Sequence, residues 1–307
     1  MHMPDVLVSP AVALPGLAAS GALLAWSCRK AAREMDDRRI PLMGVLGAFV
    51  FAAQMINLPL VVLPGVSWHL VGAVLMAAML GPYAAFIVMA AILTIQALLL
   101  GDGGLLALGC NIFNMGAVSC FLGYAVYSAA TSWLGGARGR AAGIVLASAV
   151  SLTAASLAAV IQIHLSGKSP VSLASAAWLM GSVHALCGIG EGVLSVAVLA
   201  FVAKARPASV QERSPAERAA MRKFALAGLA VSLVIGGFVS YWASSLPDGL
   251  EHAGEVLRWP FVEEAEESAS FMSSVMTGLL TTAIAFAVSL VLAAVMSRAR
   301  QAVPERS

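Results

Sequence analysis

The chain has 307 residues, of which 60% are hydrophobic and only 11% are charged. About a quarter of the residues in a soluble domain are charged, so this composition excludes an ordinary soluble enzyme. The net charge of +2 comes from short basic stretches between apolar runs, and it gives no reason to expect nucleic acid as a partner.

Eight apolar segments follow one another along the chain, and most are long enough to cross a bilayer core of about 30 Å as helices. This pattern predicts an all-α polytopic membrane protein. The first segment ends in Cys28-Arg29-Lys30 and no Lys or Arg precedes it, so we expect a retained span rather than a signal peptide. The segments cover residues 6–28, 40–62, 70–100, 105–128, 142–165, 171–203, 224–243 and 272–297.

The basic residues predict the orientation of the chain in a bacterial cell membrane. Sixteen of the 18 Lys and Arg residues lie in four stretches, which are 29–39, 132–140, 204–223 and the tail after 297. Cytoplasmic loops carry such an excess, so we expect the N-terminus outside and the C-terminus in the cytoplasm.

This orientation requires the run 70–100 to enter the membrane and return. Gly81-Pro82 supplies the break, because proline removes a helical hydrogen bond. The arm 70–80 would be about 16 Å long, too short to span the bilayer. We therefore expect the preceding loop, 63–69, to dip into the membrane from outside. Backbone at that depth is tolerated only beside protein or a cavity, so the loop indicates a binding site.

The chain is expected to divide into two membrane parts. Residues 1–203 would form a bundle of about seven helices, one of them short and re-entrant. Residues 204–223 are predicted to form a cytoplasmic linker. Residues 224–307 are predicted to form a two-span hairpin whose outer loop, 246–270, is acidic.

The N-terminal residues can form a metal chelate. The α-amine of Met1, the amide nitrogen of His2 and its imidazole can close adjacent five- and six-membered rings. Nickel(II), copper(II) and low-spin cobalt(II) accept such a planar set of nitrogens, whereas zinc prefers a tetrahedron. The predicted topology places His69, in the dipping loop, on the same side as His2, where its imidazole would complete a square of four nitrogens. Taken singly, each histidine is more often incidental.

Other polar residues in apolar segments have plain structural interpretations. Gln96, Asn111 and Asn114 are buried amides of the kind that tie helices together, and His184 with Glu191 lies on one helical face, as expected for bracing an interface. The four cysteines, Cys28, Cys110, Cys120 and Cys187, include no C-x-x-C pair and are expected to be buried thiols.

Several ordered motifs resemble those of the CbiM/NikM family, the substrate-binding components of energy-coupling-factor (ECF) importers for cobalt and nickel. They span about residues 1–203 and begin with Met-His-Met-Pro-Asp at residues 1–5. The others are Ser67-Trp68-His69-Leu70, Leu80-Gly81-Pro82, Gln96-Ala97-Leu98, Gly101-Asp102-Gly103-Gly104, Asn111-Ile112-Phe113-Asn114-Met115-Gly116 and His184-Ala185-Leu186-Cys187-Gly188-Ile189-Gly190-Glu191. Val6 and Trp68 depart from the pattern, in which both positions are usually glycine.

The resemblance implies that Met1, His2 and His69 bind Ni²⁺ or Co²⁺ as a transported ion rather than a cofactor. It also implies that Gln96, Asn111 and Asn114 orient the ligands through hydrogen bonds. Residues Pro247-Asp248-Gly249-Leu250-Glu251 resemble the P-D-G-L-E motif of the accessory domain of these systems. Its fusion to the binding component is familiar from nickel systems and slightly favours nickel.

The implied partners are a coupling transmembrane subunit (T component) and ATPase subunits (A components). ATP hydrolysis by this chain itself is not expected, because Gly167-Lys168-Ser169 lacks the first glycine of a P-loop, where Gln162 stands. Two alternatives remain: a stand-alone secondary metal permease, and an intramembrane hydrolase using His184 and Glu191. The hydrolase lacks an H-E-x-x-H or G-x-S-x-G motif.

Overall fold

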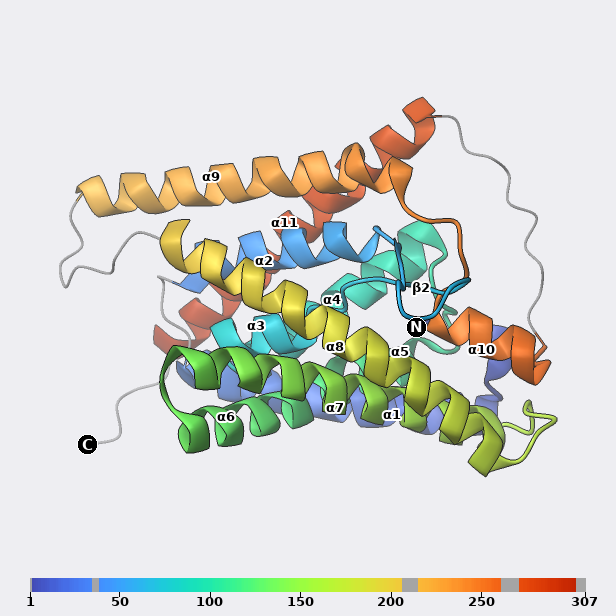
Figure 1. Cartoon of the computed structure of the whole chain (residues 1–307). Helices are drawn as coiled ribbons and strands as arrows, with labels where there is room; N and C mark the ends of the chain where they lie inside the picture. The colour runs from blue at the N-terminus through green and yellow to red at the C-terminus, as the bar shows by residue number, and fades with distance from the viewer. Residues whose placement is uncertain (1, 35–38, 206–214, 261–270, 302–307) are drawn as a thin grey trace.

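The computed structural model describes residues 2–34, 39–205, 215–260 and 271–301, and these are mostly α-helical (Figure 1). Among the described residues, seven helices are long and apolar enough to cross a membrane. The all-α polytopic prediction is therefore confirmed. The seven spans are Pro10–Glu34, Pro82–Leu100, Leu108–Leu134, Gly136–Leu165, Leu173–Val202, Ala219–Trp242 and Phe271–Ala299.

The first half begins with the short 3-10 helix η1 (Asp5–Leu7), α1 (Pro10–Glu34) and α2 (Arg39–Gln54). The apolar run 40–62 was expected to continue as helix, but α2 ends at Gln54. The chain instead forms a two-residue antiparallel hairpin of β1 (Leu58–Pro59) and β2 (Ser67–Trp68). A proline inside a helix removes a hydrogen bond and clashes with the preceding turn, so this run cannot continue as a regular helix through Pro59.

The predicted break at Gly81-Pro82 is present. The short helix α3 (Ala73–Leu80) ends at Gly81, whose φ of +83° favours glycine, and α4 (Pro82–Ile95) begins at Pro82. The two helices pack against each other. With eight residues, α3 is about 12 Å long and does not span a bilayer.

Two stretches of π-helix flank the next turn. They are η2 (Gln96–Leu100), which continues α4, and η3 (Ile112–Leu122), which joins α5 (Leu108–Asn111) to α6 (Gly123–Leu134). Such widened turns are frequent at functional sites, because they redirect side chains. Here they occur beside Gln96 and Asn111. The long helices α7 (Gly136–Leu165) and α8 (Leu173–Ala205) then complete this part.

The C-terminal part contains two long helices, α9 (Pro215–Gly237) and α11 (Phe271–Gln301), which pack against each other and against α2. A Cβ added at Gly278 would overlap the Gly236 carbonyl, so glycine permits the close approach of these two helices. In the sequence, these two helices are separated by the 3-10 helix η4 (Val239–Trp242) and α10 (Gly249–Leu257). Helix α10 was not expected, since its residues were assigned to a loop. The acids from Glu263 to Glu267 lie outside the described residues.

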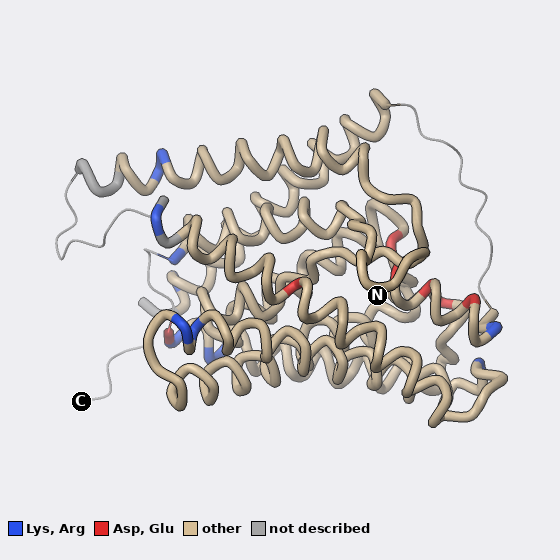
Figure 2. The backbone as a smooth tube through the Cα atoms, viewed as in Figure 1, with Lys and Arg blue, Asp and Glu red and all other residues tan. Residues whose placement is uncertain are grey.

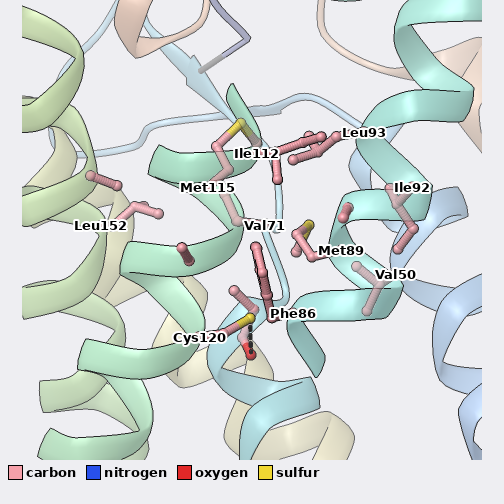
Figure 3. Close-up of a cluster of buried hydrophobic side chains, with 14 of the residues drawn as sticks. Val50, Val71, Phe86, Met89, Ile92, Leu93, Ile112, Met115, Cys120 and Leu152 are labelled. Carbon is pink, nitrogen blue, oxygen red and sulfur yellow. Dashed lines mark hydrogen bonds between the residues drawn. The ribbon is translucent and has the colours of Figure 1, made fainter. Parts of the chain in front are cut away.

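A continuous apolar core joins α2, the loop before α3, α4, η3 and α7. Figure 3 shows its centre, where Phe86, Met89 and Met115 lie among branched aliphatic side chains. Most Lys and Arg lie at one end of the bundle, whereas most Asp and Glu lie within it or toward the other end (Figure 2). The N-terminus and α10 lie toward the less basic end (Figure 1).

Candidate metal site

The N-terminal segment, residues 2–5, is anchored by hydrogen bonds to α5 and to the turn between η2 and α5. Asn111 makes two of them, because its Oδ1 accepts from Met3 N at 2.9 Å and its Nδ2 donates to Met3 O at 3.0 Å. Gly104 N donates to Met3 O at 2.9 Å, and Ala107 N donates to Asp5 Oδ1 at 2.9 Å. These bonds place His2 at a fixed point on the bundle.

The structure brings His2 and His69 together from segments 67 residues apart in the sequence. Their rings stack with centroids 5.5 Å apart and planes inclined by 16°. The His2 side chain is 7% exposed and His69 is 8% exposed. Their proximity agrees with the topology argument, while their role as ligands stays a prediction. Met1, the third expected ligand, lies outside the described residues.

A chain of buried amides runs from His2 to the loop that carries His69. His2 Nε2 lies 3.2 Å from Gln96 Oε1, and Gln96 Nε2 donates to Gln54 Oε1 at 2.7 Å. Gln54 Nε2 in turn donates to Val71 O at 2.7 Å, two residues beyond His69. Gln54 was missed in the sequence, although a lone glutamine in the apolar run 40–62 was a visible signal.

The direction of this chain presents an amide oxygen to His2 Nε2. Gln54 must donate to a carbonyl, which leaves its oxygen to accept from Gln96, and the Gln96 oxygen is then left to accept from His2. The assigned amide orientations therefore require His2 Nε2 to carry a proton. A proton on Nε2 alone would leave Nδ1 with its lone pair toward the Asp102 carboxylate, whereas that contact is favourable when Nδ1 also carries a proton.

His2 Nδ1 faces the carboxylate of Asp102, which is 44% exposed, at 3.2 Å. Burial lowers the pKa of the His2 imidazole, although the charge of Asp102 opposes this shift. Burial, followed by nearby positive charge, lowers the pKa of His69 well below its usual range. Both shifts favour neutral imidazoles, the form that binds metals.

The loop after His69 is held by Glu191 of α8. Its two carboxylate oxygens accept from Val71 N at 3.0 Å and Gly72 N at 3.1 Å. Gly72 has a φ of +74° and caps the start of α3, where the helix dipole also favours a negative charge. Glu191 therefore braces the loop. It does not pair with His184, whose Nδ1 donates to Met180 O at 2.9 Å within its own helix.

The segment before α10 covers the loop that carries His69. Ser67 N donates to Pro247 O at 2.8 Å, and Ser67 Oγ donates to Leu246 O at 2.7 Å. Asp248 then caps α10 through a reciprocal capping box with Glu251. A cavity of about 20 Å³ remains beneath this cover, lined by residues that include His69, His184, Cys187 and Asp248.

The third predicted amide, Asn114, pairs with α7. Its Nδ2 donates to Gln162 Oε1 at 2.8 Å, and Gln162 Nε2 donates back to Asn114 Oδ1 at 2.9 Å. Of the three amides, Gln96 therefore contacts the His2 ring and Asn111 holds the main chain beside it. Asn114 joins two helices. Within the described ranges, no group of three or more His, Cys, Asp or Glu residues is placed to hold a metal ion.

Comparison with known proteins shows the family of the chain. The profile of the CbiM family, described as cobalt uptake substrate-specific transmembrane region, matches residues 2–209. The chain belongs to this family. The profile of the PDGLE domain matches residues 222–270 of this CbiM-family protein, so the predicted fusion with an accessory domain is also confirmed.

Curated relatives have the same fused arrangement. A putative fused nickel transport protein of Archaeoglobus fulgidus is 35% identical over 259 residues, covering 84% of this chain and 83% of the relative. A probable fused nickel transport protein of Lactiplantibacillus plantarum is 32% identical, with coverage of 82% and 80%. This CbiM-family protein is therefore a component of metal transport and not an enzyme, and its metal ion is a substrate.

Solved structures support the fold. A truncated transition metal transporter is 33% identical and superposes with a TM-score of 0.59, covering 66% of this chain and 99% of its own. A second transition metal transporter is 32% identical with the same TM-score and covers 73% of this chain and 99% of its own. The CbiM-family protein is thus a multi-pass membrane protein with the architecture of metal transporters.

Proposed function

We propose that this chain is the substrate-binding subunit of an ATP-driven ECF importer of nickel or cobalt. The proposed ligands are the Met1 amine, the His2 amide nitrogen and the imidazoles of His2 and His69. Two imidazoles alone leave a metal with too few ligands, and the main chain at the N-terminus supplies the others. Such a planar set of nitrogens suits nickel(II) and low-spin cobalt(II). The fused nickel transport relatives favour nickel.

The contact between His2 Nε2 and the amide oxygen of Gln96 is the observation that carries this proposal. Closing a six-membered ring with its own amide nitrogen requires the lone pair of Nδ1, and the amide chain through Gln96 keeps the proton on Nε2. Hydrogen bonds to the second ring nitrogen commonly orient a metal-binding histidine and increase its basicity. The side chains around His2 are therefore arranged for Nδ1 to bind a metal.

Asp102 is the proposed first contact of the incoming ion. Its exposed carboxylate lies beside Nδ1, where it attracts a divalent cation and then yields that nitrogen to it. The segment Leu246–Pro247 closes over the loop, which excludes water and strengthens the electrostatic interactions at the site. In this proposal, the site faces the outside of the cell, and the basic end faces the cytoplasm.

The T and A components are the proposed partners for inward release. They would supply the movement and the ATP hydrolysis, while this chain selects the metal. Residues 1–203 would bind it, residues 204–223 would link the two parts, and residues 224–307 would cover the site.

Elemental analysis of the purified protein tests the site. His2→Ala and His69→Ala should each abolish retention of nickel or cobalt without preventing insertion, because each removes at least one of four nitrogens. One extra residue ahead of Met1 should act similarly by displacing the amine. His164→Ala is the matched control and should retain metal as wild type does. Normal metal content in His2→Ala would overturn the proposal.

The runner-up is a secondary metal permease that works without ATPase subunits. A permease of this kind needs an acid within the membrane that exchanges protons with the substrate's path. Glu191 has the right location, but both its oxygens already accept backbone hydrogen bonds. Uptake of radioactive nickel in cells lacking the ATPase subunits separates the two, since only the permease would continue to transport.

A further inference from the structure

A second cavity lies between α2, α8 and α9, where the CbiM part meets the accessory hairpin. Its volume is about 390 Å³, and its lining is entirely apolar apart from the backbone of Gly228. Phe201 is 66% exposed and Val231 is 47% exposed, so the cavity reaches the outer surface of the bundle. The surrounding helices are membrane spans, apart from α2, which is shorter. The bilayer is therefore the medium that this opening meets.

Basic residues of α8 and α9 lie at the basic end of the bundle (Figure 2). Lys204 lies two turns beyond Ala197 on α8, and Lys223 lies one turn before Ala227 on α9, and both alanines line the cavity. Residues four or seven apart share a face of a helix, so these two lysines lie on the cavity side of their helices. Both are exposed.

The size of the cavity limits its occupant. A spanning helix of a partner subunit, about 10 Å across and 30 Å long, fills roughly 2,400 Å³ and does not fit. A hydrocarbon chain does, because it is narrow, flexible and apolar. Basic pockets between membrane helices on the cytoplasmic side bind anionic headgroups. We propose that this cavity binds an acyl chain of one anionic phospholipid, whose headgroup lies beside Lys204 and Lys223.

A lipid in this position would join the two parts of the chain. The cavity is lined by Phe49 of α2 and Val198 of α8 on one side, and by Phe224 of α9 on the other. An acyl chain would fill the gap among these helices and stabilise the docked position of the accessory hairpin. The site is separate from the metal site, so it does not depend on the proposed transport function.

Native mass spectrometry of the delipidated full-length protein tests the proposal. Phosphatidylglycerol and phosphatidylcholine with identical acyl chains would be titrated separately. Wild type should bind one phosphatidylglycerol more tightly than phosphatidylcholine, by up to about 25-fold if each lysine contributes about fivefold. The double variant Lys204→Gln/Lys223→Gln should lose the preference for phosphatidylglycerol. Ala227→Phe should weaken the binding of both lipids, because the larger side chain fills the cavity.

Two matched controls keep the test specific. Arg222→Gln removes a charge next to Lys223 but on the opposite side of α9 from the cavity, and should keep the preference. Ala230→Phe adds the same bulk to α9 outside the cavity lining and should bind lipid as wild type does. Equal binding of the two lipids to wild type would overturn the proposal. So would a loss of preference in Arg222→Gln as large as that in the double lysine variant, or unchanged binding by Ala227→Phe.

Discussion

Cutting the amide chain at Gln96 should weaken metal binding without removing a ligand. In Gln96→Leu, His2 Nε2 loses the acceptor that lies 3.2 Å away, and Gln54 Oε1 loses its donor at 2.7 Å. Loss of such a partner typically lowers metal affinity 10- to 100-fold, which corresponds to about 1.4–2.8 kcal/mol. The cause is that the His2 ring is no longer held in one orientation and tautomer.

Gln54→Leu should have a smaller effect on affinity, because Gln96 remains beside His2 but loses its own anchor. Its larger effect should be on stability, since the Val71 carbonyl and the Gln96 amide are left buried without these bonds, at about 1–3 kcal/mol each. The double variant should bind metal no more weakly than Gln96→Leu alone. Residues in one hydrogen-bond network show this non-additivity.

Affinity would be measured by competition with a chelator, and thermal unfolding would be followed separately. The matched control is Gln162→Leu, which breaks the Asn114–Gln162 amide pair away from both imidazoles. It should lower stability and leave affinity unchanged. Wild-type affinity in Gln96→Leu would refute the reasoning, as would an equal loss in Gln162→Leu or additive losses in the double variant.

Three further predictions concern the elements around the site. Gly104→Ala should abolish metal retention, measured by elemental analysis, because its Cβ would overlap Asp5 and displace the N-terminal segment. The control is Gly21→Ala on α1, which has open space around it and should retain metal as wild type does. Glu191→Gln should speed hydrogen exchange at the Val71 and Gly72 amides and lower metal affinity about tenfold, because one acceptor becomes a donor facing an N–H. Unchanged exchange would contradict this role. Asp248→Ala should lower the stability of α10 by about 1 kcal/mol through loss of its N-cap. It should also speed metal release from the loaded protein, measured by chelator trapping. A wild-type release rate would show that α10 does not help to close the site.

The sequence was sufficient for those parts of the fold that local chemistry determines. Long apolar runs must satisfy their backbone hydrogen bonds internally, so the spans were predictable, and Gly81-Pro82 marked a break that the structure confirms. The end of α2 was misplaced because apolar composition concealed the turn residues Asn57 and Pro59. Helix α10 was missed although Asp248 and Glu251 have capping-box spacing, because the acidic stretch was interpreted as a loop.

The contacts around the candidate site were less predictable, because they depend on how each helix is rotated about its axis. The proximity of His2 and His69 followed from topology, since both were expected on one side of the membrane at similar depth. Whether Gln96 would face His2 and Asn114 would face Gln162 depends on the rotation of η2 and η3. The π-helical turns in these stretches shift that rotation, and the sequence contains no pattern that predicts π-helical turns.

The anchoring of the N-terminal segment has a consequence for synthesis of the protein. His2 is among the first residues translated, but the amides that hold it come about 90–110 residues later, and the cover at Pro247 comes about 245 residues later. At about 5–20 residues per second, the covering segment appears on the order of ten to fifty seconds after His2. In the proposed orientation, the N-terminus would cross the membrane during that interval without its final partners. The candidate site would thus be completed late in translation, and only a nearly finished chain could close over an ion.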